Sequence, residues 1–310
     1  MEEALMNETG RKVKITSISF SQRPLDEFID IVDEEGKRGC DLIQLPEACA
    51  CVKTPNDLME KLDGKSIGRI AEIAARHGVY IVYPMSRESE TGERFNSSVL
   101  IGRKGEICGV YDKVYPFWEE FDFKPTTSIG REAPVFETDF GKIGFAICFD
   151  ANFPDVFNRL SQNGAELVLW SSAYSAGMSL QAHAINYNYI IVTSTLCSDC
   201  IIYDITGEEI YYQKKPYGEV LVNHLTLDLD RCIFHTDYNW GKREQLLKDY
   251  AGKIESDVYL QREAWFTLRA TIPGVSAREI AAKYNMEELT AYKNRSQNEI
   301  DKMRGFRFTD

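Results

Sequence analysis

The sequence lacks the features of membrane-spanning and exported proteins. No stretch of its 310 residues approaches the roughly 20 uninterrupted apolar residues that a bilayer-spanning helix needs. Residues 1–12 carry Glu2, Glu3 and Glu8 where a secretory signal would have positive charge and then an apolar run. We therefore expect residues 1–12 to form an N-terminal arm, and we expect no membrane partner.

Positive charge is also scarce, with 36 Lys and Arg against 48 Asp and Glu, a formal net charge of -12. Binding to nucleic acid draws its affinity largely from Lys and Arg that displace counterions from phosphates, so no nucleic-acid partner is expected. Only the segment 276–289 is similar to the first half of a helix-turn-helix, and the charges from there to the C-terminus nearly cancel. We interpret this region as a helical clasp at the interface of a homo-oligomer, a dimer or higher.

The eight cysteines are too few for a disulfide-stapled scaffold in a chain of this length, which favours a reducing, cytoplasmic location. Two close pairs, Cys49 with Cys51 and Cys197 with Cys200, have spacings that could ligate zinc. Free cysteine more often serves as a small buried hydrophobic residue. We therefore expect no metal.

Hydrophobic periodicity predicts a mixed α/β domain over residues 13–232. Residues 13–20 alternate apolar and polar side chains as a strand does, and helices alternate with short apolar strands thereafter. Turn residues separate two pairs of strands, at 102–105 and 206–207, which predicts two hairpins. Residues 233–310 are more polar, with a capping box from Ser276 to Glu279, and we expect them to form a C-terminal helical extension.

Three chemically capable side chains follow predicted strands in this domain. Cys148 ends the strand 142–147 and begins a turn, where outward-pointing N–H groups can stabilise an oxyanion. Glu47 follows an apolar strand and Pro46, so its carboxylate can lose solvation and become a better proton acceptor. Lys113 follows the first hairpin and could hold an oxyanion. Each residue alone has an ordinary structural explanation, but their placement at successive strand ends predicts a thiol hydrolase.

These segments resemble the nitrilase superfamily of carbon-nitrogen hydrolases. The resemblance rests on Asp41–Glu47, on Tyr111–Lys113 and on the highly specific stretch Phe136–Asp150 with Phe153–Pro154, and it covers about residues 13–230. It implies a four-layer α-β-β-α sandwich and a catalytic triad at Glu47, Lys113 and Cys148.

The resemblance also implies a second active-site glutamate, which we place at Glu120, with Glu119 as the alternative. It implies an amidase-like enzyme that cleaves a non-peptide amide or N-carbamoyl bond of a small molecule through a Cys148 thioester, with the Phe149 N–H beside the oxyanion and no cofactor. Predicted pocket residues are Tyr115, Trp170 and Tyr174, which follow catalytic strands, and the loop 171–179 is favoured over any one of them.

Three departures from the family pattern flank the site, namely Asn152 in place of a common Arg, Asp155 in place of Glu, and Asn186 in place of an acid. The loop 171–179 contains no arginine, which disfavours bidentate recognition of a substrate carboxylate. The alternatives are a nitrilase, a Cys-His hydrolase that uses His183, and a metabolite-binding protein without catalysis.

Overall fold

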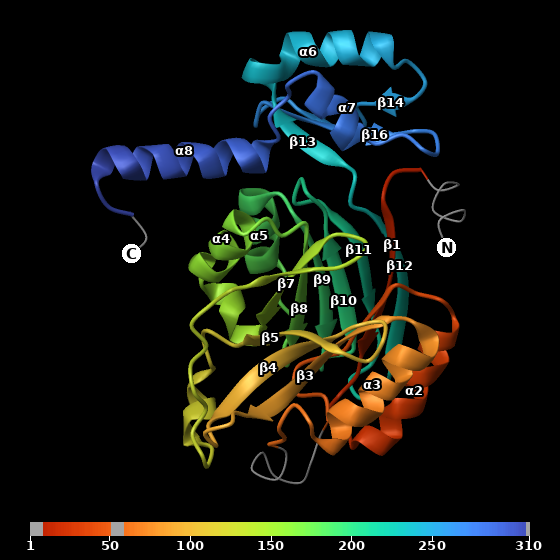
Figure 1. Ribbon diagram of the computed structural model, residues 1–310, viewed down its shortest axis with the longest axis vertical. Helices are drawn as coiled ribbons and strands as arrows, with labels where there is room; N and C mark the ends of the chain where they lie inside the picture. Colours follow the sequence, from red (N-terminus) through yellow and green to blue (C-terminus); the bar gives the residue numbers. More distant parts are fainter. Residues whose placement is uncertain (1–8, 51–58, 308–310) are drawn as a thin grey trace. The chain divides into compact units, whose positions relative to one another are not determined.

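The computed structural model describes residues 9–50 and 59–307 (Figure 1). Among them the chain divides into two compact units, one of residues 14–226 and the other of residues 9–13 with 227–307. The sequence-based boundaries at 12/13 and 232/233 lie close to these divisions. Cys51 of the zinc hypothesis lies outside the described residues.

The larger unit contains two six-stranded sheets. The first has the order β12 (Leu221–Asp228), β1 (Lys12–Ser19), β2 (Leu42–Gln44), β3 (Tyr80–Glu88), β4 (Arg94–Ile101) and β5 (Ile107–Asp112). The second has the order β11 (Glu209–Lys214), β10 (Asp199–Tyr203), β9 (Ile190–Thr195), β8 (Leu167–Ser172), β7 (Lys142–Ile147) and β6 (Val135–Glu137). In each sheet three neighbouring strands are parallel, β1–β2–β3 and β7–β8–β9, and antiparallel strands extend the sheet.

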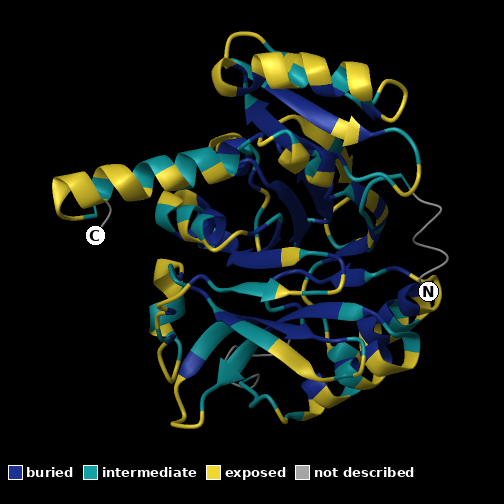
Figure 2. Cartoon of the chain, turned by 45° about the horizontal axis from the view of Figure 1, so that its top comes forward, coloured by how far each residue is buried: buried dark blue, intermediate teal, exposed yellow. Residues whose placement is uncertain are grey.

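Helices cover the outer face of each sheet (Figure 1). They are α2 (Leu25–Lys37) and α3 (Lys65–His77) on the first sheet, and α4 (Pro154–Gln162) and α5 (Met178–Tyr187) on the second. Helix α3 buries Ile67, Ile70 and Ala74 at helical spacing and ends at Gly78, whose φ of 64° suits glycine. The strands are largely buried and the outer helix faces exposed (Figure 2). The predicted α-β-β-α sandwich and its two hairpins are confirmed.

The two sheets are joined face to face by side-chain hydrogen bonds as well as by apolar packing. Ser171 Oγ of β8 donates to the Leu45 carbonyl after β2 at 2.8 Å, and Gln44 Nε2 donates to the Trp170 carbonyl at 3.1 Å. Ser17 Oγ of β1 donates to the Thr193 carbonyl at 2.7 Å. These bonds fix the end of β2 against the end of β8, where the candidate site lies.

The second unit is mixed rather than helical, which corrects the prediction for residues 233–310. Its strands are β13 (Cys232–His235), β14 (Ile254–Glu255), β15 (Tyr259–Leu260) and β16 (Trp265–Ala270), and its helices are α6 (Thr236–Asp249), α7 (Ala277–Lys283) and α8 (Leu289–Arg304). Phe234 and Phe266 stack in its core. Strands β13, β14 and β15 have only two to four residues, too few for a clear alternation, and the six-residue strand β16 was overlooked beside the helical pattern.

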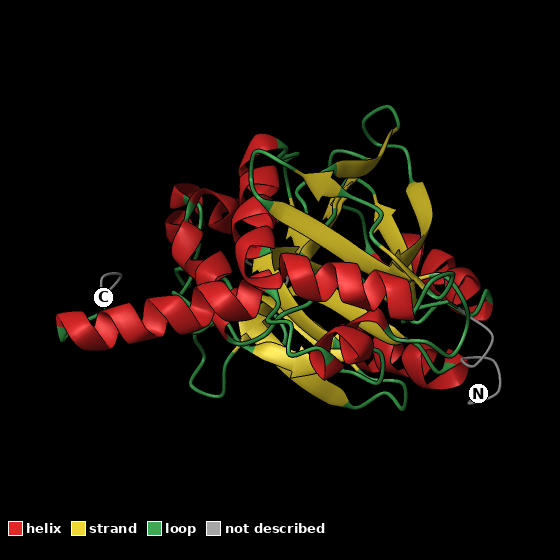
Figure 3. Cartoon of the chain, turned by 90° about the horizontal axis from the view of Figure 1, so that it is seen from above, coloured by secondary structure: helices red, strands yellow, loops and turns green. Residues whose placement is uncertain are grey.

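The predicted cap of α7 forms, since Ser276 Oγ accepts the Glu279 N–H at 3.1 Å. Helix α8, the long helix at the left of Figure 3, buries only Leu289. Across residues 9–50 and 59–307, no helix is both long enough and apolar enough to cross a membrane.

Candidate active site

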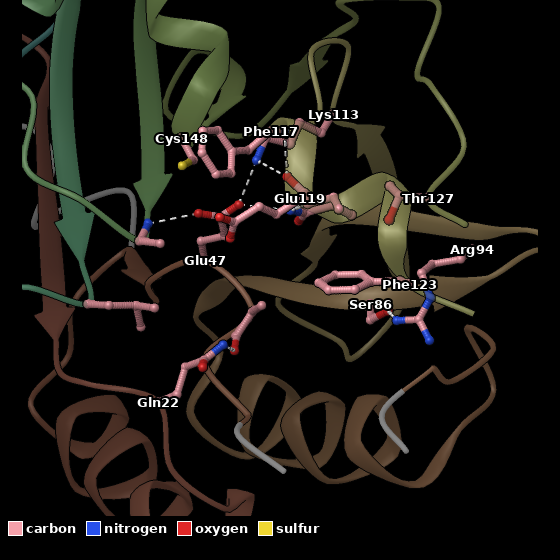
Figure 4. A pocket seen from close by; sticks show the side chains of 15 residues that line it. Gln22, Glu47, Ser86, Arg94, Lys113, Phe117, Glu119, Phe123, Thr127 and Cys148 are labelled. Carbon is pink, nitrogen blue, oxygen red and sulfur yellow. Dashed lines mark hydrogen bonds and ion pairs between the residues drawn. The ribbon is translucent and has the colours of Figure 1, made fainter. Parts of the chain in front are cut away.

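A cavity of about 420 Å³ lies where strand ends from both sheets meet. Its lining includes all four residues expected to be catalytic, namely Glu47, Lys113, Glu120 and Cys148 (Figure 4). A volume of this order fits a small molecule, and most ligand pockets of proteins have about 300–1,000 Å³. The structure therefore brings together side chains that lie about a hundred residues apart in the sequence.

Lys113 is the centre of the polar cluster. It follows β5, is 1% exposed, and its Nζ lies 2.8 Å from Glu47 Oε1 and 2.6 Å from Glu120 Oε1. Burial lowers the pKa of Lys113, but Glu47, Cys148 and Glu120 outweigh it and raise the pKa above its usual value. Lys113 therefore stays an ammonium at neutral pH.

Glu47 is held on both carboxylate oxygens. It comes after β2 and Pro46 and is 5% exposed. Its Oε1 accepts from Lys113 and from Asn96 Nδ2 at 2.8 Å, and its Oε2 accepts the Ala173 backbone N–H at 2.8 Å. A carboxylate fixed by three donors is oriented before substrate arrives, as a positioned general base must be.

Cys148 lies at a strained turn between β7 and the short 3-10 helix Cys148–Asn152. Its φ of 46° is in the left-handed region, which costs a non-glycine residue on the order of 1 kcal/mol or more. Burial, and after it the Glu47 carboxylate, raise the pKa of the Cys148 thiol to about 12, although Lys113 and the Ala173 N–H lower it. The resting thiol is therefore protonated, with a carboxylate beside it that can accept the proton.

The structure distinguishes the two candidates for the second glutamate. Glu120 Oε1 accepts from Lys113 and from the Phe117 N–H at 2.9 Å, and Oε2 accepts from Asn96 Nδ2 at 3.0 Å. Glu119 also lines the cavity, but its side chain is exposed. Glu120 is therefore the carboxylate that the fold connects to Lys113.

The loop 171–179 contributes Ala173 to the cavity lining, whereas Tyr115, Trp170 and Tyr174 are not among the described residues that line it. Trp170 is fully buried, and its Nε1 donates to the Cys148 carbonyl at 3.1 Å, so it supports the turn of Cys148. Tyr115 stacks on Phe153 and donates to Asp155, and Tyr174 packs edge-on against Trp170. Their aromatic rings fill the shell behind the site, which sequence alone does not distinguish from a pocket wall.

Phe149 packs edge-on against Phe117, and Phe117 lines the cavity. The Phe149 backbone N–H belongs to the first turn of the 3-10 helix Cys148–Asn152, where N–H groups have no acceptor within the helix. That backbone group is therefore available to an oxyanion next to Cys148.

Sequence reasoning missed Asn96 and Arg94, and it predicted the loop of Ala173 without its bond to Glu47. Asn96 bridges Glu47 and Glu120, the Ala173 N–H holds Glu47, and Arg94 lines the cavity on the side away from Cys148 (Figure 4). Arg94 is 2% exposed, with Nε bonded to the Pro125 carbonyl at 3.1 Å and its guanidinium over Phe123. A cavity arginine therefore comes from β4, although the loop 171–179 has none.

The residues of the Cys-His and zinc alternatives have surroundings that differ from those of the catalytic cluster. His183 Nε2 lies 2.9 Å from the Ala151 carbonyl and the ring stacks on Phe157, while burial lowers its pKa. Burial raises the pKa of Cys49 and of Cys200, to about 12 for Cys200. In residues 9–50 and 59–307, no three His, Cys, Asp or Glu side chains are grouped so as to hold a metal ion.

Known proteins are similar to this chain in sequence. The family model described as carbon-nitrogen hydrolase matches residues 22–209. A probable nitrilase of Schizosaccharomyces pombe is 31% identical over 183 residues, which are 55% of this chain and 65% of that protein. An omega-amidase of Mus musculus is 23% identical over 254 residues, 76% of this chain and 89% of that protein. A deaminated glutathione amidase of Mus musculus is 27% identical over 210 residues, 59% of this chain and 64% of that protein.

Solved structures share the fold. An amidase of Nesterenkonia AN1 from the nitrilase superfamily superposes with a TM-score of 0.60 at 19% identity, covering 79% of this chain and 99% of that one. A Saccharomyces cerevisiae member of branch 10 of the same superfamily gives a TM-score of 0.61 at 16% identity, covering 75% of this chain and 95% of that one. The matched family model spans more than half of the chain, and the chain belongs to the carbon-nitrogen hydrolase family.

Proposed function

We propose that this protein is a thiol amidase, which hydrolyses a non-peptide amide or N-carbamoyl bond of a small molecule and releases ammonia or an amine. The observation that carries the proposal is the cluster in which Lys113 Nζ lies between the Glu47 and Glu120 carboxylates, on the same cavity wall as Cys148. Nucleophile, base and cation are the three groups that acyl transfer through a thioester requires.

The first half of the reaction forms the thioester. Glu47 takes the proton from Cys148 as the sulfur attacks the carbonyl carbon, and the C=O electron pair moves onto oxygen. Lys113 and the Phe149 N–H stabilise this oxyanion. Glu47 then gives its proton to the leaving nitrogen, the carbon-nitrogen bond breaks, and ammonia or an amine departs.

The second half of the reaction hydrolyses the thioester and regenerates the free enzyme. Glu47 takes a proton from water, and the resulting hydroxide attacks the thioester carbon. The oxyanion that forms is again stabilised by Lys113 and the Phe149 N–H. The carbon-sulfur bond then breaks, the product carboxylic acid leaves, and Cys148 recovers the proton from Glu47. Glu120 holds Lys113 and Asn96 holds Glu47 through both halves, and the Asn96 side chain also donates to Glu120, which links the two.

Three features support a small-molecule substrate in a reducing compartment. The cavity volume of about 420 Å³ excludes a folded polypeptide. The seven cysteines among the described residues are free, and the mechanism needs Cys148 as a thiol. The relatives described above include an omega-amidase and a deaminated glutathione amidase, which are amidases by name, beside a probable nitrilase. A cytoplasmic location and a homo-oligomer with an interface formed by residues 233–310 remain predictions.

The test is ammonia release by the purified protein from a panel of amides, N-carbamoyl compounds and nitriles. Each amide with a neutral acyl chain is paired with one of equal length that carries a carboxylate, because Arg94 lines the cavity. We expect hydrolysis of amides by the wild type and none by Cys148→Ala at equal folded content. Hydrolysis of nitriles alone would assign a nitrilase, and turnover of no compound, with no acyl group trapped on Cys148, would favour a metabolite-binding protein.

A further inference from the structure

Asp150 is a fully buried carboxylate that the mechanism above does not use. It is 0% exposed, two residues after Cys148, and is not among the described residues that line the cavity. A buried carboxylate without catalytic contact is costly unless several donors satisfy it, so its partners indicate what it does.

Three donors reach Asp150 from two parts of the site. Tyr111 Oη and the Ile147 N–H donate to Oδ2 at 2.7 and 2.9 Å, and the Tyr115 N–H donates to Oδ1 at 2.9 Å. Tyr111 and Tyr115 are the residues two before and two after Lys113. Ile147 directly precedes Cys148.

The pattern of donors is therefore specific. The Asp150 carboxylate accepts from Tyr111 and Tyr115, which lie on either side of Lys113 in the sequence. It also accepts from Ile147, which precedes Cys148, while Asp150 itself follows Cys148 in the same turn. Because Cys148 adopts φ of 46°, the turn needs such support to stay in place. We propose that Asp150 is the positioning residue that sets the separation and alignment of Lys113 relative to Cys148.

This role predicts a distinct kinetic signature and rests on the proposed function above. Asp150 does not reach the cavity wall, so its loss leaves substrate binding intact while it misplaces the oxyanion-stabilising ammonium relative to the attacking sulfur. A misplaced donor affects the transition state more than the ground state. The effect therefore falls on kcat rather than on KM.

The acid limb of the pH profile gives a second readout. Burial raises the pKa of Asp150 to about 6, although Tyr111, the Ile147 N–H and Lys113 act to lower it. Below that pH Asp150 is protonated, and its carboxyl proton competes with one of the three donors for an Asp150 oxygen. Lys113 and Tyr111 have raised pKa values and keep their protons there, and the pKa of Tyr115 is raised to about 12.

One further titratable group contacts the turn of Cys148. His183 of α5 lies against the Ala151 carbonyl, and burial lowers its pKa, so its titration must be separated from that of Asp150. The variant His183→Gln removes the imidazole and makes this separation.

The experiment measures kcat, KM and their pH dependence for Asp150→Asn, Tyr111→Phe and His183→Gln. In Asp150→Asn an amide nitrogen faces one of the three donors. We expect kcat to fall about tenfold or more while KM stays within about twofold. We also expect the acid limb of the pH profile, near pH 6, to shift. Tyr111→Phe removes one donor without loss of the ring, and we expect a smaller fall in kcat at constant KM. His183→Gln keeps the acid limb.

Asp230→Asn is the matched control for burial. Asp230 is also a buried carboxylate with a raised pKa, and it accepts from Ser276 Oγ and the Ala277 N–H at 2.5 Å within the second unit. We expect this variant to lose thermal stability and to keep its kcat per folded molecule. If Asp150→Asn behaves in the same way, or if its acid limb stays in place, the proposal is overturned.

A substrate-free measurement separates this proposal from the proposed function. The alkylation rate of Cys148 by iodoacetamide depends on the thiolate that Lys113 stabilises. We expect severalfold slower alkylation in Asp150→Asn and in Tyr111→Phe than in the wild type. Unchanged alkylation in a folded Tyr111→Phe and a folded Asp150→Asn overturns the positioning role, even if the wild type proves to hydrolyse no amide.

Discussion

Replacement of Glu47 by glutamine tests the base of the proposed mechanism at nearly constant side-chain volume. Oε1 of Glu47 accepts from Lys113 and Asn96, and Oε2 accepts from the Ala173 N–H. Glutamine has one acceptor oxygen and one NH₂ group, so either orientation sets a donor against a donor. An unsatisfied buried group of this kind costs about 1–3 kcal/mol of stability, and loss of a general base costs about 10²- to 10⁴-fold in rate.

The assay is steady-state ammonia release, with thermal unfolding measured in parallel to count folded molecules. Glu35→Gln serves as the control, because Glu35 is a buried glutamate of α2 that pairs with His224 at 2.6 Å on the outer side of the first sheet. We expect Glu35→Gln to lose stability and retain its kcat. A Glu47→Gln variant that is folded and keeps more than about one tenth of the wild-type kcat would refute the assignment of Glu47 as base.

Three other perturbations follow from the geometry. Glu120→Gln, which weakens the carboxylate bonded to Lys113, should lower kcat by about tenfold or more, whereas Glu119→Gln should lower it far less; equal effects would contradict the assignment. Gly130→Ala should reduce activity and stability, because a Cβ at Gly130 overlaps the Asp112 carbonyl just before Lys113. Unchanged kinetics would show that the backbone before Lys113 can shift without affecting catalysis. Because the pKa of the Cys148 thiol is raised to about 12, its alkylation in the absence of substrate should still accelerate as pH rises from 8 to 10; a plateau near pH 7 would contradict this.

The sequence predicted the parts of the site that depend on local pattern. Cys148 and Glu47 follow buried strands and Lys113 follows the half-exposed strand β5, and the ends of these strands meet when the two sheets pack face to face. The alternation of strands and helices with two hairpins predicted a mixed α/β domain, and the sandwich was implied by the family resemblance. The family motif around Cys148 then specified how these elements are layered.

The remaining parts depend on tertiary contacts that have no local signature. Asn96 reaches both glutamates because β4 pairs with β5 in a register that sets it beside Lys113, whose N–H donates to the Asn96 carbonyl at 2.8 Å. The Ala173 contribution is a backbone N–H, which any residue except proline could supply. Trp170 looked like a pocket residue because it follows the catalytic strand, yet its indole is directed into the core toward the Cys148 carbonyl.

The central claim is that Cys148 forms a covalent acyl intermediate. The most direct measurement is intact-protein and peptide mass spectrometry after rapid acid quench of the enzyme with an amide that it hydrolyses. The account predicts a mass increase equal to the acyl group, located on the peptide that contains Cys148 and absent from Cys148→Ala. An acyl group on another residue, or turnover by Cys148→Ala without any acyl adduct, would contradict it.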